Sequence, residues 1–438
     1  MRINVPPKPA FTHEGAVASQ IKPIDELRRT VLACLLWESG FYESGEAVAD
    51  RIKRLVPLCH PHEVAEIAIE ARDKQRLRHA PLLLVRELAR DAKRCPDGLI
   101  ARTLQHVIQR ADEPAEFLSL YWKDGKAPLA KQVKKGLAAA LTRFDAYALA
   151  KYDRANAVRL RDVLFLVHAT PKDKAQAAVW KQLVEGTLPA PDTWEVALSA
   201  GSDKKDAFER LLREKKLGYM ALLRNLRNMQ QAEVDASLVF EALQSGAAKS
   251  KALPFRYVAA ARAVPAWEPQ IDAAMQIALG GLEKIPGKTV LLVDVSGSMD
   301  ASLSAKSDLN RMDAAAALAV LVRGVCEDAR VFTFSERLVE VPARSGMALI
   351  DAVIHSQRHS ATYLGGALEK LRAQLQADRL IVITDEQSHD AVGKPIGRGY
   401  IINVATNQRG VGYGDWTHIN GFSEAVVQYI AELERQRA

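Results

Sequence analysis

The spacing of the apolar residues changes near residue 285, and this change constrains the fold more than any other feature of the chain. Before it, apolar residues recur at helical spacing. Two such stripes are Ile24, Leu27, Val31, Leu35 and Leu36, and Leu99, Ile100, Leu104, Val107 and Ile108. Prolines separate the stripes, and strand-like alternation is nearly absent. We therefore predict an all-α domain over residues 1–284, built from short helices that pair and stack as a HEAT-like helical repeat.

After the run Ile285-Pro286-Gly287-Lys288, strands and helices alternate. Residues 289–293 form a β-branched, apolar run, which is typical of a buried parallel strand. The spacing predicts further strands at 330–334, 338–341, 380–384 and 400–404, and helices at 312–326, 347–354, 364–375 and 423–434. This alternation predicts an α/β domain over residues 285–438 with a doubly wound, Rossmann-like parallel sheet.

The positive charge of the chain is confined to the helical part. Residues 1–286 hold 44 Lys and Arg against 35 Asp and Glu, whereas residues 287–438 hold 16 against 18. A basic surplus in one part suggests that this part meets a polyanion such as nucleic acid. A surplus of this size is also common on solvated helices, so charge alone favours a nucleic-acid partner only slightly.

The four cysteines lie far apart and form no CxxC pair: Cys34, Cys59, Cys95 and Cys326. This spacing favours reduced, mostly buried thiols. The first 18 residues lack the apolar core of a signal peptide, and no apolar run reaches the roughly 18 residues of a membrane span. We expect a cytoplasmic, monomeric protein that does not associate with membranes.

The first strand of the α/β domain ends in a run of oxygen-bearing side chains, Asp294-Val295-Ser296-Gly297-Ser298. Ligands of open α/β sheets bind beyond the carboxyl ends of the strands. Side chains at positions i, i+2 and i+4 can converge on one point, with Gly297 allowing a tight backbone. Asp385 follows a later strand in the same way, and Thr362 lies in a loop before a helix. Carboxylates and hydroxyls are hard donors, so the set predicts a site for Mg²⁺, or alternatively Ca²⁺ or Mn²⁺.

This pattern, DxSxS followed by Thr and then Asp, resembles the metal-ion-dependent adhesion site of von Willebrand factor A domains. The resemblance carries a metal-ligand role to Asp294, Ser296, Ser298, Thr362 and Asp385. In the family, such a site leaves one coordination position open, so the resemblance implies a protein partner that donates a carboxylate. Two alternatives stay open: a capping loop without metal, and a site that binds metal weakly or without function.

The same residues give little support to catalysis. A phosphatase with an aspartyl nucleophile needs a second carboxylate two residues after Asp294, where Ser296 stands. The chain also shows no Ser–His–Asp order and no P-loop signature. We expect a non-enzymatic protein with no catalytic residues.

Three segments of the helical part are more specific than its composition. They are Lys151-Tyr152-Asp153-Arg154, Arg161-Asp162-Val163-Leu164 leading to His168, and Ala221-Leu222-Leu223-Arg224-Asn225-Leu226. Together they resemble the TROVE module of Ro-type RNA-binding proteins, over about residues 20–280. A TROVE module followed by a von Willebrand factor A domain is the domain order of Ro proteins. The resemblance implies a ring of HEAT-like repeats closed by the metal domain. It also implies small noncoding (Y) RNA on the outer surface, and single-stranded ends of structured or misfolded RNA in a basic central hole.

The resemblance places RNA contacts at Lys151 and His168. The family often has an arginine four residues after this lysine, where the chain has Ala155 with Arg154 beside it. We therefore include Arg154 among the candidate RNA contacts. His168 follows a mainly apolar helix, so a core histidine remains the alternative for this residue.

Residue spacing adds further candidates for RNA contact. Lys131, Lys134 and Lys135 lie at i, i+3 and i+4, on one face of a predicted helix, and Arg224 lies on another helix. Such cations neutralise phosphates without reading sequence. The alternatives are a solvated helix face for the lysines, and for Arg224 a structural ion pair with an acidic residue on the next helix.

These observations lead to one expected function and two rivals. We expect a Ro-like scaffold that binds small noncoding RNA and single-stranded RNA ends, and that acts in RNA stability or quality control. The first rival is an adhesion-like module whose metal site binds a protein partner, with no physiological RNA ligand. The second, less supported, is a metal-dependent hydrolase.

Overall fold

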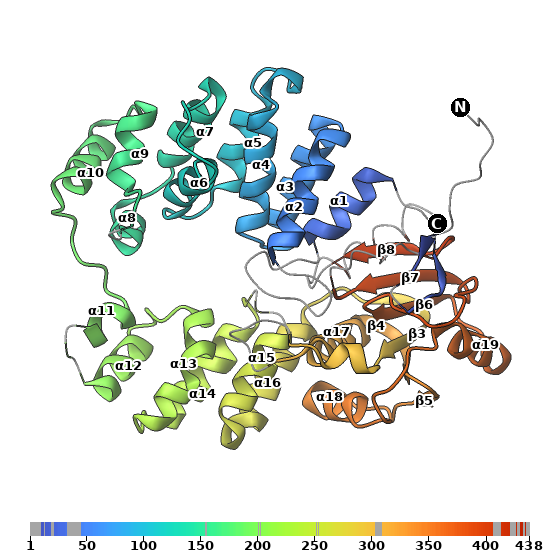
Figure 1. Cartoon of the computed structure of the whole chain (residues 1–438). Coiled ribbons are helices and arrows are strands. Elements are labelled where there is room, and N and C mark those ends of the chain that lie inside the picture. The colour runs from blue at the N-terminus through green and yellow to red at the C-terminus, as the bar shows by residue number, and fades with distance from the viewer. Residues whose placement is uncertain are drawn as a thin grey trace, which may run out of the picture. The chain divides into compact units, whose positions relative to one another are not determined.

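The computed structural model of the chain divides into two compact units. We call residues 49–200 the helical unit, and residues 1–48 with 201–438 the composite unit. Figure 1 labels the helices of both and the strands β3 to β8. The residues that the structure describes are 10–12, 14–18, 22–32, 45–153, 156–199, 201, 203–250, 252, 254–302, 309–405, 413–420, 426, 430, 431 and 434.

The helical unit is a succession of short helices, the first of which begins just before the unit's boundary. They are α2 (Gly45–Leu55), α3 (Pro61–Asp73), α4 (His79–Arg90), α5 (Leu99–Val107), α6 (Glu113–Tyr121), α7 (Lys131–Leu141), α8 (Ala146–Tyr152), α9 (Leu160–Val167), α10 (Lys174–Glu185) and α11 (Trp194–Ser199). Here α3 packs against α5, α5 against α7 and α7 against α9, while α4 contacts α6 and α6 contacts α9. Stacking of alternate helices in this way is the arrangement of a helical repeat, as predicted.

Local sequence features explain where these helices begin and which face of each is buried. The predicted stripe of α5, which extends one residue beyond its end, is buried at every position: Leu99, Ile100, Leu104, Val107 and Ile108. Pro61 occupies the first turn of α3, where its missing N–H costs no helical hydrogen bond. The Asp145 carboxylate accepts a hydrogen bond from the Ala148 backbone N–H at 2.7 Å and so caps α8.

The composite unit contains helices that precede the strands of its large sheet in the sequence. They are α12 (Lys204–Arg213), α13 (Tyr219–Gln231), α14 (Ala236–Ala247), α15 (Pro254–Ala263) and α16 (Glu268–Gly280). The Arg262 guanidinium on α15 donates two hydrogen bonds to the Asp313 carboxylate, one of them at 2.6 Å. The Asp272 carboxylate on α16 accepts from the Met347 backbone N–H at 2.9 Å. These contacts join the last helices of the repeat directly to the α/β domain.

The sheet of the composite unit has the strand order β5-β4-β3-β6-β7-β8. All neighbours are parallel except β5, which pairs antiparallel at one edge. Its strands are β3 (Ile285–Asp294), β4 (Cys326–Phe334), β5 (Leu338–Glu340), β6 (Arg379–Thr384), β7 (Arg398–Asn403) and β8 (Thr417–Asn420). The helices between them are α17 (Arg311–Val325), α18 (Gly346–Ile354) and α19 (Leu364–Gln374).

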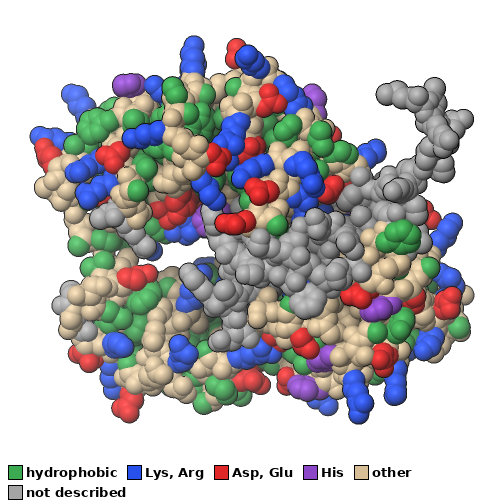
Figure 2. Space-filling model, in the orientation of Figure 1, with side chains coloured by type: hydrophobic (Ala, Val, Ile, Leu, Met, Phe, Trp, Pro, Cys, Tyr) green, Lys and Arg blue, Asp and Glu red, His purple; other side chains and the backbone are tan. Residues whose placement is uncertain are grey.

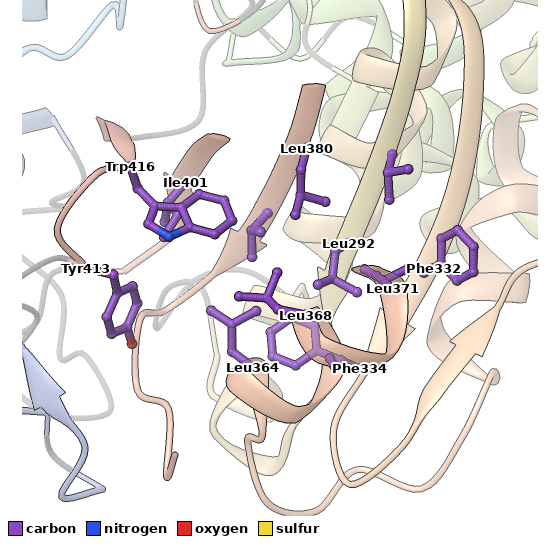
Figure 3. Close-up of a cluster of buried hydrophobic side chains, with 13 residues drawn as sticks. Leu292, Phe332, Phe334, Leu364, Leu368, Leu371, Leu380, Ile401, Tyr413 and Trp416 are labelled. Carbon is purple, nitrogen blue, oxygen red and sulfur yellow. The ribbon is translucent and has the colours of Figure 1, made fainter. Parts of the chain in front are cut away.

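Helices cover both faces of this sheet. Leu368 and Leu371 of α19 pack in one buried cluster with Leu292 and Leu380 of the central strands (Figure 3). Residues that alternate with these along β3 point to the other face, where α17 contacts β3 and β4. The prediction of a helical part followed by a doubly wound α/β domain is therefore confirmed. β3 begins at Ile285, where the predicted second domain starts.

The N-terminal segment belongs to the composite unit, although the sequence pattern grouped it with the helical repeat. It forms a short hairpin, β1 (Ala10–Phe11) and β2 (Val17–Ala18), followed by α1 (Pro23–Leu32), which packs against β8. β8 was not predicted. Leu35 and Leu36 of the first predicted stripe lie outside the described residues, as does most of the predicted helix over 423–434.

Three of the four cysteines lie within the described residues. Cys59, Cys95 and Cys326 are free thiols, and Cys34 lies outside the described residues. Across the described part of the chain, each helix is too short or too polar to cross a bilayer.

Candidate functional site

The predicted metal ligands meet at the carboxyl ends of two adjacent parallel strands. Asp294 is the last residue of β3, and Asp385 directly follows β6, its hydrogen-bonded neighbour. Both carboxylates are fully buried. The Thr384 hydroxyl donates a hydrogen bond to Asp294 Oδ2 at 2.6 Å, which fixes the Asp294 carboxylate from the neighbouring strand.

The serine loop folds back onto Asp294. The Ser296 backbone N–H donates to Asp294 Oδ1 at 2.9 Å, and the hydroxyls of Ser296 and Ser298 lie 3.2 Å apart. The two hydroxyls therefore converge, as the i+2 and i+4 spacing predicts. Ser296 is fully buried and Ser298 half-buried, so the loop runs from the sheet interior toward its surface.

Hydrogen bonds tie the Thr362 loop to the other two loops. The Gly297 backbone N–H donates to the Ser360 carbonyl at 2.8 Å, and the His389 N–H donates to the Thr362 carbonyl at 2.8 Å. Thr362 is buried at this junction. The structure thus brings the loops of all five predicted ligands together beyond the carboxyl ends of the central strands.

Burial gives the two aspartates an unusual electrostatic state. Burial, and after it the nearby Asp385 charge, raises the pKa of Asp294. Hydrogen bonds from Ser296 and Thr384 partly oppose this rise. Burial also raises the pKa of Asp385, against the lowering effect of the Arg311 guanidinium, whose Nη1 lies 3.6 Å from Asp385 Oδ2. Neither Asp385 carboxylate oxygen has a hydrogen-bond partner among the described residues.

This donor set fits a hard divalent cation. Two buried carboxylates close to each other favour a bound positive charge, and the oxygens of Asp385 lack hydrogen bonds that would otherwise satisfy them. No group of three or more His, Cys, Asp or Glu within the described ranges could hold a metal ion. A cation at this site therefore depends on the hydroxyls of Ser296, Ser298 and Thr362 beside the carboxylates.

The tight backbone of the serine loop does not require a glycine at position 297. The φ of Gly297 is not positive, and an added Cβ would lie 3.5 Å from the Ser360 carbonyl oxygen, an ordinary contact. The convergence of the serines therefore rests on hydrogen bonds of the loop backbone and not on a conformation that only glycine adopts.

Sequence reasoning missed a second buried cluster beside the site. Glu386 follows Asp385, is fully buried and has a left-handed backbone with φ of 60°. Arg29 of α1 lies 2.8 Å from its carboxylate, and His418 Nδ1 of β8 lies 3.2 Å from it. The only sequence signal was the Glu386 carboxyl at a strand end, because its partners are far away in the chain.

The lysine triad of α7 lies on the solvent side of its helix. Val133, Leu137 and Ala140 form the buried face, whereas Lys131 and Lys135 are exposed and Lys134 is half-buried. Within the described residues, none of the three lysines makes an ion pair. They thus present positive charge that no carboxylate of the described chain compensates.

Lys151 and His168 are both accessible in the helical unit. Lys151 is half-buried near the end of α8 and contacts two tyrosine rings. His168 is exposed and ends α9 in a left-handed conformation with φ of 52°, so the alternative of a core histidine is wrong. Arg154 and Ala155 lie outside the described residues.

Arg224 is exposed on α13, and no acidic partner faces it among the residues that the structure describes. The alternative of a structural ion pair therefore has no support. On the face seen in Figure 2, Lys and Arg side chains are interspersed with Asp and Glu over the helical part and do not form one continuous patch.

In comparisons with known proteins, different family models match the helical part and the α/β domain. The family model described as TROVE domain matches residues 180–280, and the model described as Ro60 vWA domain matches residues 288–396. The second match contains all five predicted metal ligands. Of the three segments that carried the TROVE resemblance, residues 221–226 lie within the first match, and the other two precede it.

Individual proteins are also similar to the chain. Telomerase protein component 1 of Mus musculus is 35% identical over 89 residues, which are 19% of this chain and 3% of that protein. The chain therefore spans only a small part of this curated relative. The crystal structure of Deinococcus radiodurans RO (RSR) protein aligns with 95% of this chain and 100% of its own, with a TM-score of 0.61 and 20% identity. This likeness shows a shared fold.

Proposed function

We propose that this chain, which joins a TROVE domain to a von Willebrand factor A domain of the Ro type, is a non-enzymatic RNA-binding scaffold. The observation that carries the proposal is the set of accessible cations without carboxylate partners among the described residues: Lys131, Lys134, Lys135, Lys151 and Arg224. Uncompensated cations on helix surfaces bind phosphates, and they release counterions when they do so.

The RNA class follows from how these cations are presented. They lie on the helices α7, α8 and α13, and lysine and arginine side chains of this kind contact the phosphate backbone without reading base edges. We extend the proposal to small noncoding RNA and to single-stranded ends of structured or misfolded RNA, and to a role in RNA stability or quality control.

The test is filter binding with a hairpin RNA that carries a single-stranded 3′ tail. Affinity should fall steeply between about 50 mM and about 200 mM salt, because each neutralised phosphate releases counterions. Changing Lys151 and His168 together to Ala should weaken binding. A wild-type protein that binds the RNA no better than an unrelated protein of equal charge contradicts the proposal.

A second function, binding of a divalent cation at the von Willebrand factor A domain, is favoured by the buried Asp294 and Asp385. Asp294, Ser296, Ser298, Thr362 and Asp385 would hold the ion, Mg²⁺ first among Mg²⁺, Ca²⁺ and Mn²⁺. A cation with an open position supplies a site for a carboxylate of a protein partner. This function is compatible with RNA binding by the helices.

Calorimetric titration of the protein with MgCl₂ tests this second function. Asp294→Ala should abolish the binding heat, whereas Asp415→Ala, at a largely exposed aspartate of the same domain, should leave it unchanged. Binding heat that persists in Asp294→Ala contradicts the site. RNA affinity that is the same in Asp294→Ala and wild type would place RNA binding outside the metal site.

A further inference from the structure

Helix α8 carries an exposed aromatic ring beside an unpaired cation. Leu149 is the fully buried residue of this helix, and Tyr147 lies two positions before it, about 200° around the helix axis. Half of the Tyr147 side chain is exposed to solvent. Tyr147 and Lys151 are four residues apart and so share one face of α8, with the lysine Nζ 5.9 Å from the ring centroid.

A second ring, that of Tyr152, lies beside Lys151 and contacts two cations. Lys151 Nζ lies 5.8 Å from the Tyr152 ring centroid, and the Arg110 guanidinium lies 4.6 Å from the same centroid. Arg110 is itself fixed by two hydrogen bonds to the Asp112 carboxylate, at 3.1 and 2.9 Å. Lys151, by contrast, has no carboxylate partner among the described residues, so its positive charge is available to a ligand.

An exposed ring next to an uncompensated ammonium group matches the chemistry of single-stranded nucleic acid. A base presents a flat π-face that stacks on tyrosine, and its phosphate carries the charge that a lysine binds. A double-stranded helix does not offer its bases for stacking. A protein partner would be expected to cover an apolar patch, whereas here an exposed aromatic ring lies beside positive charge.

We propose that Tyr147 stacks on a base of a single-stranded RNA segment while Lys151 binds the adjacent phosphate. We call these two residues the stacking platform. Tyr152, which Arg110 contacts, supports the Lys151 side chain. This inference rests on the proposed RNA-binding function and assigns the contact on α8. Stacking is tolerant of sequence, because every base has a π-face, so the platform selects unpaired nucleotides and not a motif.

Binding of two probes to the full chain separates stacking from charge. The first is single-stranded oligo(A) of about 12 nucleotides, and the second is an abasic strand of the same length and charge. Tyr147→Leu should weaken oligo(A) binding at least about fivefold and leave the abasic strand unchanged, because the ring is lost and the apolar volume kept. Tyr147→Phe keeps the ring and should bind both probes as wild type does. Lys151→Met should weaken both.

The matched control is Phe11→Leu, which removes another exposed ring from a part of the chain distant in sequence. It should bind both probes as wild type does. Unchanged oligo(A) binding by Tyr147→Leu overturns the stacking contact, and so does an equal loss for both probes. If wild type binds the tailed hairpin RNA but Tyr147→Leu is unaffected, the platform fails while the proposed function stands. If wild type binds neither RNA, the proposed function itself fails.

Discussion

Thr384 shows how a residue outside the predicted ligand set can control the proposed metal site. Its hydroxyl donates to Asp294 Oδ2 at 2.6 Å, and its side chain is buried. Asp294 has a raised pKa from burial and from Asp385, so each hydrogen bond that favours its ionised form matters for cation binding. Partners that orient a ligand in this way alter metal affinity without touching the ion.

Thr384→Val should therefore weaken Mg²⁺ binding by about 10- to 100-fold, since valine keeps the shape but cannot donate. Calorimetric titration measures this change. Thr333→Val is the matched control, because Thr333 is also a buried strand threonine with a hydroxyl contact, at 2.7 Å to Ser356, but on β4. Equal losses in the two variants would show that Thr384 acts on stability and not on the ligand.

At the scale of single elements, the loop after β6 that contains Asp385 is held by a helix from the opposite end of the sequence. Arg29 of α1 pairs with Glu386, one residue after Asp385, and both side chains are buried. Breaking a buried pair by removing one partner leaves an uncompensated charge, which typically costs about 3–5 kcal/mol.

Arg29→Met should accordingly lower the unfolding free energy of the composite unit by about 3 kcal/mol. Chemical denaturation followed by circular dichroism measures the loss. The double variant Arg29→Met with Glu386→Gln should lose less than Arg29→Met alone, because the remaining buried charge is neutralised. Losses that simply add would mean that the pair is not coupled.

The start of α18 depends on a glycine because the backbone there is left-handed. Gly346 has φ of 59°, and an added Cβ would also meet the Asp272 carboxylate of α16. Gly346→Ala should destabilise the protein by about 1–3 kcal/mol. Gly366→Ala is the control within α19, where the nearest side-chain atom would be at an ordinary 3.5 Å. Thermal unfolding should show a loss for the first variant and none for the second.

Elements with a strong local period were predictable, whereas elements set by distant partners were not. The strands that end in Asp294 and before Asp385 follow from their apolar runs, and the meeting of the candidate ligands follows from their position at strand ends. β8 has only four residues with mixed polarity, and its pairing with β7 supplies what its sequence does not indicate. The placement of α1 depends on Arg29 meeting Glu386, a contact that no local pattern encodes.

At the scale of the whole molecule, charge and chemistry are divided between its parts. The basic surplus lies before residue 287, whereas the α/β domain is nearly balanced and contains the buried carboxylate site. This division suits a protein in which helices bind a polyanion and the metal site binds an acidic group. Because buried charges are screened much less than exposed ones, salt should weaken RNA binding far more than binding of the metal ion to its buried carboxylates.

The salt dependence of RNA binding provides a count of the cations that contact phosphates. For single-stranded RNA, the slope of log affinity against log salt is about −0.7 per neutralised phosphate. Changing Lys131, Lys134 and Lys135 to Ala together should therefore reduce the magnitude of the slope by about 2, if each lysine neutralises one phosphate. Filter binding over a series of salt concentrations measures both slopes.

The control for this count is a second triple variant at lysines that already have carboxylate partners. These are Lys53 with Asp50, Lys181 with Glu185 and Lys394 with Asp415. Their removal changes the net charge by the same amount but frees three carboxylates from ion pairs, so the slope should remain close to that of wild type. If both triple variants lower the slope equally, the RNA responds to net charge, and the lysine face of α7 is a solvated surface without a specific contact.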